Sequence, residues 1–243
     1  MGEIILVASG KGGTGKSVFA VNLGAVLADN GYRVVLIDMD MGQGNLDLYL
    51  GLHNKVVYNV YDAAMGMCRM KQALIRDGRY DCLYLMAAPP HTNDGNVTAE
   101  RLAAMHGDLR EKFDYIIVDA PAGVENNTML AATGADRAVI VATPDYASVR
   151  GADVLDMKLR EAGIDERLYV INKVKAHMMD AEGIPSFGEI GMLIRSKVVG
   201  VIPYDDNIDF SVSLGIPAAS DSRNIMKDVF NKIARRIINT NGR

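Results

Sequence analysis

The chain has 243 residues, of which 49% are hydrophobic and 23% are charged, as is ordinary for a soluble globular protein. Its net charge of −4 argues against a surface dominated by nucleic-acid binding, although a local basic patch could still exist. The two cysteines, Cys68 and Cys82, form no C-x-x-C pair, which excludes a zinc ribbon and disfavours a cysteine-ligated cluster. No signal-peptide pattern precedes the first predicted strand, and no apolar run approaches the ~18 residues of a spanning helix.

Short apolar segments rich in β-branched residues alternate with longer segments of helical periodicity along the chain. The predicted strands are 3–8, 33–38, 83–87, 114–119, 137–142, 167–172 and 198–202. The predicted helices are 16–30, which Gly31 is expected to end, 98–112, 146–162 and 222–239. Continuous apolar strands separated by helices are typical of a parallel sheet that is covered on both faces. The sequence therefore predicts an α/β fold with three layers, a doubly wound and mostly parallel sheet, in a single domain over residues 1–243.

The segment between the first predicted strand and the first predicted helix matches the P-loop pattern G-x-x-x-x-G-K-[ST]. Its glycines let backbone amides face phosphate oxygens, and the helix N-terminus adds partial positive charge at the same place. Lys16 is expected to reach the β- and γ-phosphates, and the Ser17 hydroxyl to bind Mg²⁺. A glycine turn with a chance Lys-Ser is the alternative, which the strand–loop–helix context disfavours. The residues predicted to hold the phosphates are Gly10, Lys11, Gly12, Gly13, Thr14, Gly15, Lys16, Ser17 and Val18.

Carboxylates close two of the predicted strands, at the end of the sheet where such folds bind ligands. Asp119 is predicted to bind Mg²⁺ through its water shell, the alternative being a helix N-cap. Asp38 is predicted to support Mg²⁺ from outside the direct ligands of the ion, and Asp40 to orient an attacking water; solvated turn residues are the alternative for both. Gly123 is a candidate hinge for a loop that senses the γ-phosphate.

With these residues, the chain resembles the ParA/MinD family of deviant-Walker P-loop ATPases, and within it the MinD branch. The P-loop with its extra lysine, Lys11, matches the family motif K-G-G-x-G-K-[ST]. Residues 37–40 resemble the family's switch I and residues 119–123 its switch II, and further matching segments extend from residue 4 to about 240.

The resemblance implies roles for several residues. Lys11 would reach across an ATP-sandwiched dimer to the phosphates bound by the partner subunit and act like an arginine finger. Together with Lys16 and Asp40, it completes the set of predicted catalytic residues. Asn172 would bind adenine, although Asn at a strand end is also an ordinary turn former. The residues that would flank the base are Pro203, Tyr204 and Asp205.

The function that the resemblance implies is an ATPase switch. It would bind ATP with Mg²⁺, close a homodimer and hydrolyse ATP slowly, under stimulation by a MinC- or MinE-like protein partner, to place the cell-division site or serve a similar positioning process. The expected location is cytoplasmic, with the inner face of the cell membrane as a peripheral contact. A DNA-partitioning ATPase and a flagellar- or pilus-positioning ATPase are the alternatives, and the acidic balance makes DNA an unlikely partner.

The last predicted helix bears on the membrane question. Ile225, Val229, Ile233 and Ile237 form one stripe along it, which favours docking on the core over membrane anchoring. A separate anchor helix is not evident after this segment, so the sequence leaves membrane binding open.

Overall fold

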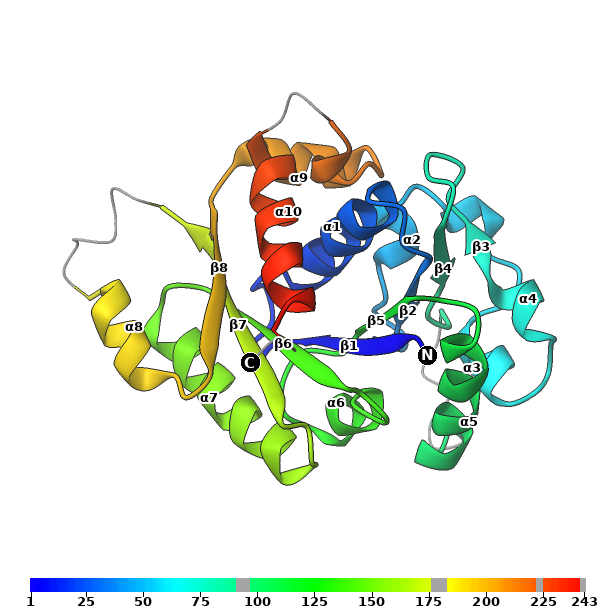
Figure 1. Ribbon diagram of the computed structural model, residues 1–243, viewed down its shortest axis with the longest axis horizontal. Helices are drawn as coiled ribbons and strands as arrows, with labels where there is room; N and C mark the ends of the chain where they lie inside the picture. Colours follow the sequence, from blue (N-terminus) through cyan, green and yellow to red (C-terminus); the bar gives the residue numbers. More distant parts are fainter. Residues whose placement is uncertain (91–96, 176–182, 222–224, 241–243) are drawn as a thin grey trace.

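The computed structural model describes residues 1–90, 97–175, 183–221 and 225–240. A sheet of eight strands in the order β3-β4-β2-β5-β1-β6-β7-β8 forms its centre (Figure 1). Neighbouring strands are parallel, except that β3 runs antiparallel to β4 at one edge. The strands are β1 Glu3–Ala8, β2 Val34–Asp38, β3 Ile75–Arg76, β4 Leu83–Met86, β5 Tyr115–Asp119, β6 Arg137–Ala142, β7 Glu166–Val174 and β8 Lys197–Pro203.

All seven predicted strands are present, and their ends lie within two residues of the predicted ones. Their β-branched, apolar residues suit a sheet that is covered on both faces; every residue of β6, for example, is buried. The edge strand β3 was not predicted, because two residues are too few to show a periodicity.

The four long predicted helices are confirmed as α1, α5, α7 and α10, while residues 222–224 of the last prediction lie outside the described part. Backbone bonds from Gly31 and Tyr32 to the last turn of α1 end that helix where it was predicted to end. The prediction missed every shorter helix. The helices are α1 Lys16–Asp29, α2 Leu46–Tyr49, α3 Val60–Ala64, α4 Met70–Ala73, α5 Ala99–Arg110, α6 Asn126–Ala131, α7 Tyr146–Glu161, α8 Phe187–Leu193, α9 Asp206–Ser213 and α10 Ile225–Ile238, with 3-10 turns η1 His53–Lys55 and η3 Ala218–Ser220.

Helices cover both faces of the sheet, which confirms the predicted three-layer fold (Figure 1). One face carries α1 and α10, and the apolar cluster there also includes residues of α2 and η3. The other face carries α5, α6, α7 and α8, whose buried side chains form the second cluster.

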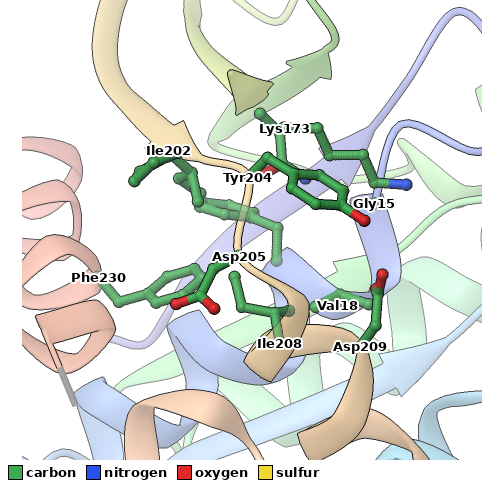
Figure 2. Close-up of a pocket in the computed structure, with 12 residues that line it drawn as sticks. Gly15, Val18, Lys173, Ile202, Tyr204, Asp205, Ile208, Asp209 and Phe230 are labelled. Carbon is green, nitrogen blue, oxygen red and sulfur yellow. The ribbon is translucent and has the colours of Figure 1, made fainter. Parts of the chain in front are cut away.

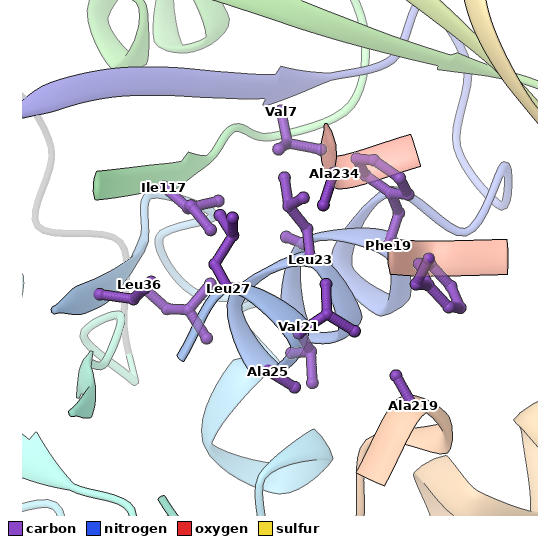
Figure 3. Close-up of a cluster of buried hydrophobic side chains, with 14 of the residues drawn as sticks. Val7, Phe19, Val21, Leu23, Ala25, Leu27, Leu36, Ile117, Ala219 and Ala234 are labelled. Atoms are coloured by element: carbon purple, nitrogen blue, oxygen red, sulfur yellow. The ribbon is translucent and has the colours of Figure 1, made fainter. Parts of the chain in front are cut away.

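The helix α1 lies at the centre of the first layer. Leu23 and Leu27 of this helix are buried among strand residues that include Leu36 and Ile117 (Figure 3). On its other side the ring of Phe19 lies 6.1 Å from the ring of Phe230 of α10. Burying one such side chain contributes about 1.5–3 kcal/mol. The start of α1, where the P-loop ends, is therefore held firmly in place.

The last helix docks on the core, as predicted, but its buried stripe differs from the predicted one. Ile225 is 70% exposed, and Met226 and Phe230 are buried in its place, together with Ile233 and Ile237. The prediction is wrong only in the first half of the helix, where Ile225 is its exposed first residue and Val229 is partly buried. No helix in the described part of the chain is both long enough and apolar enough to cross a membrane.

Candidate nucleotide-binding site

The predicted P-loop lies between the carboxyl end of β1 and the first turn of α1. Two of its glycines are required by close approaches. A Cβ atom on Gly10 would lie 2.1 Å from the backbone of Gly151 in α7. Gly15 has a φ of +86°, and a Cβ atom there would lie 2.3 Å from the amide nitrogen of Asn172. The loop therefore packs closely against both α7 and β7.

Lys16 and Asp119 form a buried ion pair at the base of the loop. Lys16 Nζ lies 2.8 Å from Asp119 Oδ1, and their side chains are 6% and 1% exposed. Lys16 also donates to the Ser17 hydroxyl at 3.2 Å. Burial raises the pKa of Asp119, and the charge and hydrogen bond of Lys16 act in the opposite direction. The alternative of a helix cap for Asp119 is wrong, because Glu125 holds the N-cap position of α6.

Asp38 lies beside Asp119, since the two residues are paired in the register of β2 and β5. It is buried and accepts hydrogen bonds from the amides of Asp40 and Leu46, each at 3.0 Å. Burial, reinforced by the charge of Asp119, raises the pKa of Asp38 to about 7. The alternative of a solvated turn residue is therefore wrong for Asp38. Asp40 is half-buried, and burial raises its pKa.

Lys11 is half-exposed at the rim of the loop. Its Nζ lies 3.3 Å from Asp145 Oδ1, with both side chains about half accessible to solvent. Asp145 is the N-cap of α7, where it accepts a bond from the Ser148 amide at 2.9 Å. The candidate hinge Gly123 has a φ of +102°, and its amide donates to the Ser9 carbonyl at 2.8 Å. The loop after β5 is therefore tied to the strand end that enters the P-loop.

Two neighbouring pockets share lining residues at the loop. The P-loop pocket is lined by residues 12–18 together with Asp40, Gln43, Asn45 and Tyr49. The apolar pocket lies next to it and is lined by side chains that include Ile202 and Phe230 (Figure 2) and also Phe19 of α1. The residues common to both pockets are Gly15, Val18, Lys173 and Asp209.

The residues predicted to surround a base come together in the apolar pocket. Asn172, Pro203, Tyr204 and Asp205 all line it. Asn172 is buried and donates from Nδ2 to the Thr14 carbonyl at 2.8 Å. The prediction that Asn172 ends its strand is wrong, because β7 continues to Val174. The expected phosphate-binding and base-binding segments are thus neighbours in space.

Some residues of this region escaped sequence reasoning. Asp145 and Lys173 contact the P-loop from more than 130 positions away, and neither belongs to the P-loop motif. Tyr49 and Asp209 line the P-loop pocket from short helices that the sequence did not predict. Asp145 alone had a signal, because an Asp directly before a helical segment is typical of an N-cap.

Comparison with known proteins decides the family. A family model described as an AAA domain matches residues 2–167. The septum site-determining protein MinD of Bacillus subtilis is 38% identical over 240 residues, which cover 98% of this chain and 90% of the relative. The chain belongs to the ParA/MinD family. The MinD protein of Synechocystis is 37% identical, again over 98% of this chain and 90% of the relative.

Solved structures of ParA/MinD-family members have the same fold. A MinC:MinD cell division protein complex of Aquifex aeolicus matches with a TM-score of 0.89 and 31% identity, over 97% of this chain and 96% of that one. MinD of Pyrococcus horikoshii, solved in complex with Mg-ADP, matches with a TM-score of 0.88 and 25% identity, over 100% and 98%.

Proposed function

We propose that the protein is a MinD-type ATPase switch, which binds ATP with Mg²⁺, closes a homodimer and hydrolyses ATP in placing the cell-division site. The observation that carries the proposal is that two neighbouring pockets share four lining residues at the P-loop. A polar pocket at a helix N-terminus suits a chain of phosphates, and the apolar pocket beside it suits a base. The relatives named septum site-determining proteins supply the biological context.

In this proposal residues 10–18 hold the phosphates, with Lys16 as their main cation. Asn172 reads the base, and Pro203, Tyr204 and Asp205 border it. Asn172 suits this role because Nδ2 of its amide is already fixed by Thr14, which sets the direction of its oxygen. One chain would carry all the residues that bind the nucleotide, which come from the P-loop after β1, from the ends of β2, β5, β7 and β8, and from the segment after β8.

The oxygen-bearing side chains around Lys16 suit a Mg²⁺ ion that is held largely by phosphates and water. Within the described residues, no group of three or more His, Cys, Asp or Glu side chains is arranged as a metal cage. The donors beside Lys16 are hard oxygens: the Ser17 hydroxyl, Asp119 and Asp38. Mg²⁺ keeps several waters and prefers such a set together with nucleotide phosphates. When bound, the ion would neutralise charge on the phosphates.

Catalysis would need a second copy of the chain. Lys11 would donate its charge to the phosphates of the partner subunit, and Asp40, half-buried at the rim of the P-loop pocket, would orient the attacking water. Lys11→Ala should then lower ATP hydrolysis stimulated by a regulatory protein partner, while sparing much of the nucleotide binding by the monomer. Asp40→Ala should give a dimer that persists with ATP.

The test measures mass in solution together with hydrolysis. Light scattering should show a monomer with ADP and a dimer with ATP and Mg²⁺, and the Asp40→Ala dimer should outlast that of the wild type. An Asp40→Ala protein that stays monomeric with ATP and Mg²⁺ would contradict the switch, and unchanged stimulated turnover in Lys11→Ala would remove the role of that lysine.

The cellular partners belong to the same proposal. A MinC-like protein is the expected partner, because the Aquifex structure is named as a MinC:MinD complex. We further propose a cytoplasmic protein that contacts the membrane peripherally in its ATP form. Flotation with anionic vesicles tests that contact, and salt-dependent binding of the ATP form to random duplex DNA would instead favour the DNA-partitioning alternative.

A further inference from the structure

The strand β7 contains a β-bulge at the edge of the site. Its Ile171 pairs with Val201 of β8, but the next pair is Val174 with Pro203, so β7 has one residue more than its partner there. Lys173 lies in this bulge with a φ of +58°, and it is the only non-glycine residue in the described ranges with a positive φ. Bulges beside active sites commonly redirect a side chain.

The bulge brings two consecutive side chains to the same loop. In a regular strand Asn172 and Lys173 would point to opposite faces of the sheet. Here Asn172 Nδ2 donates to the Thr14 carbonyl at 2.8 Å, and Lys173 Nζ donates to the Gly13 carbonyl at 2.9 Å. Figure 2 shows the Lys173 side chain extended toward Gly15. Successive carbonyls of the P-loop are thus held from one strand end.

Within the described part of the chain, the Lys173 side chain makes one hydrogen bond, to the Gly13 carbonyl, and it also lines both pockets. The left-handed backbone conformation favours glycine and is strained for a side chain with a Cβ atom. Lys173 is exposed, so its burial does not offset this strain. What the side chain supplies is the amine on Gly13, itself a residue with a φ of +79°.

We propose that Lys173 is a positioning residue, which fixes the P-loop in the shape that binds phosphate. The amine fixes the Gly13 carbonyl, and with it the peptide unit whose N–H belongs to Thr14. A fixed loop presents its amides to a diphosphate without first having to become ordered. The inference rests on the proposed nucleotide-binding function and deepens it: Lys173 should act on ADP and ATP alike, since both carry the phosphates that the loop would hold.

The experiment compares Lys173→Gly, Lys173→Met and Lys173→Arg with the wild-type protein. Glycine removes the amine and relieves the backbone, Met removes the amine alone, and Arg restores a cationic donor. Lys197→Met is the matched control, because it removes an exposed lysine from the start of β8, in the same edge pair of strands. The measurements are hydrogen exchange of residues 10–16 without nucleotide, ADP affinity by calorimetry, and the thermal midpoint.

We expect Lys173→Gly and Lys173→Met to bind ADP about tenfold more weakly, as the loss of one charge-assisted hydrogen bond predicts. Exchange of the loop amides should quicken in both without nucleotide, and the thermal midpoint of Lys173→Gly should not fall. Lys173→Arg should recover most of the affinity, and Lys197→Met should match the wild type.

Unchanged loop exchange in Lys173→Gly and Lys173→Met would overturn the inference, because a purely electrostatic effect on the nucleotide leaves the free loop as it was. A lower thermal midpoint with faster exchange throughout Lys173→Gly would also overturn it, by showing a general structural role. If the wild type itself does not bind ADP, the proposed function fails, and the exchange measurement still decides whether Lys173 orders the loop.

Discussion

Replacing Asp119 by Asn tests the electrostatics of the buried cluster most directly. The change keeps the shape of the side chain but removes the charge that faces Lys16 at 2.8 Å. Both side chains are almost fully buried, so water cannot replace the lost partner. Without nucleotide, the variant should therefore be markedly less stable than the wild type.

The magnitude follows from the cost of an unpaired buried charge. Removing one partner of a buried ion pair costs about 3–5 kcal/mol. The lower end applies here, because Asp38 lies in register with Asp119 and supplies part of the missing negative charge. About 3 kcal/mol corresponds to roughly 6–12 °C in the thermal midpoint of a chain of this length.

The assay is urea and thermal unfolding without nucleotide, with Asp114→Asn as the matched control. Asp114 also pairs with an arginine, Arg33, at 2.7 Å, but both side chains are more than a third exposed. That change should cost under about 1 kcal/mol. An Asp119→Asn protein that loses no more stability than Asp114→Asn would refute the account of the cluster.

A second arm adds ADP in the presence of a chelator. The phosphates should supply the negative charge that Lys16 lacks in Asp119→Asn, so ADP should raise the stability of the variant more than that of the wild type. If ADP leaves the gap between the two proteins unchanged, Lys16 does not face the phosphates.

Three further changes have defined outcomes. Asp145→Asn keeps the N-cap of α7 but removes the carboxylate that pairs with Lys11. Because an exposed ion pair contributes at most ~1 kcal/mol, ATP-dependent dimerisation should strengthen by up to about fivefold. Ultracentrifugation measures this, and weaker dimerisation would contradict it. Gly15→Ala should abolish ADP binding, measured by calorimetry, because the new Cβ atom would collide with the Asn172 side chain. A Cβ atom on Gly12 has nothing within 4 Å, so Gly12→Ala should leave the thermal midpoint unchanged. His106 is buried with Nδ1 3.0 Å from the Thr133 carbonyl, and burial lowers its pKa below 6.5, so the folded state resists its protonation. The contribution of His106 to stability should therefore fall as the pH drops below about 6.5, by at most ~1.4 kcal/mol per pH unit, while the raised pKa of Asp38 acts in the opposite direction. Urea unfolding should show that His106→Gln loses less stability than the wild type over this range, and an identical pH slope in the two proteins would exclude His106 as a contributor.

The sequence predicted the frame of the fold because its strands are buried on both faces. β1 and β6 have the predicted bounds, since each is a run of apolar residues between polar ones. The region between β2 and β4 was largely missed. Its helices α2, α3 and α4 have four or five residues each, too few for a helical period to appear.

The candidate site divides in the same way. Residues 10–18 and the carboxylates at the strand ends could be predicted because a local motif and the parallel sheet place them together. Lys173 could not, because its position depends on a bulge in the pairing of β7 with β8. A one-residue difference between two strands leaves no mark on the apolar pattern of either strand.

The contacts of the three lysines suggest a division of labour within the site. Lys16 is paired with the buried carboxylate of Asp119. A phosphate that replaces this carboxylate as the partner of Lys16 must therefore offset the large electrostatic cost of separating the buried pair. Lys11 is held by an exposed carboxylate, and exposed pairs exchange partners at a cost of at most ~1 kcal/mol. Lys173 is bonded to a carbonyl and need not change partner at all. Changes at Asp119 should therefore act mainly on nucleotide binding, and changes at Asp145 mainly on closure of the dimer. A variant of Asp145 that altered ADP affinity as strongly as Asp119→Asn would show that the two steps are not separable in this way.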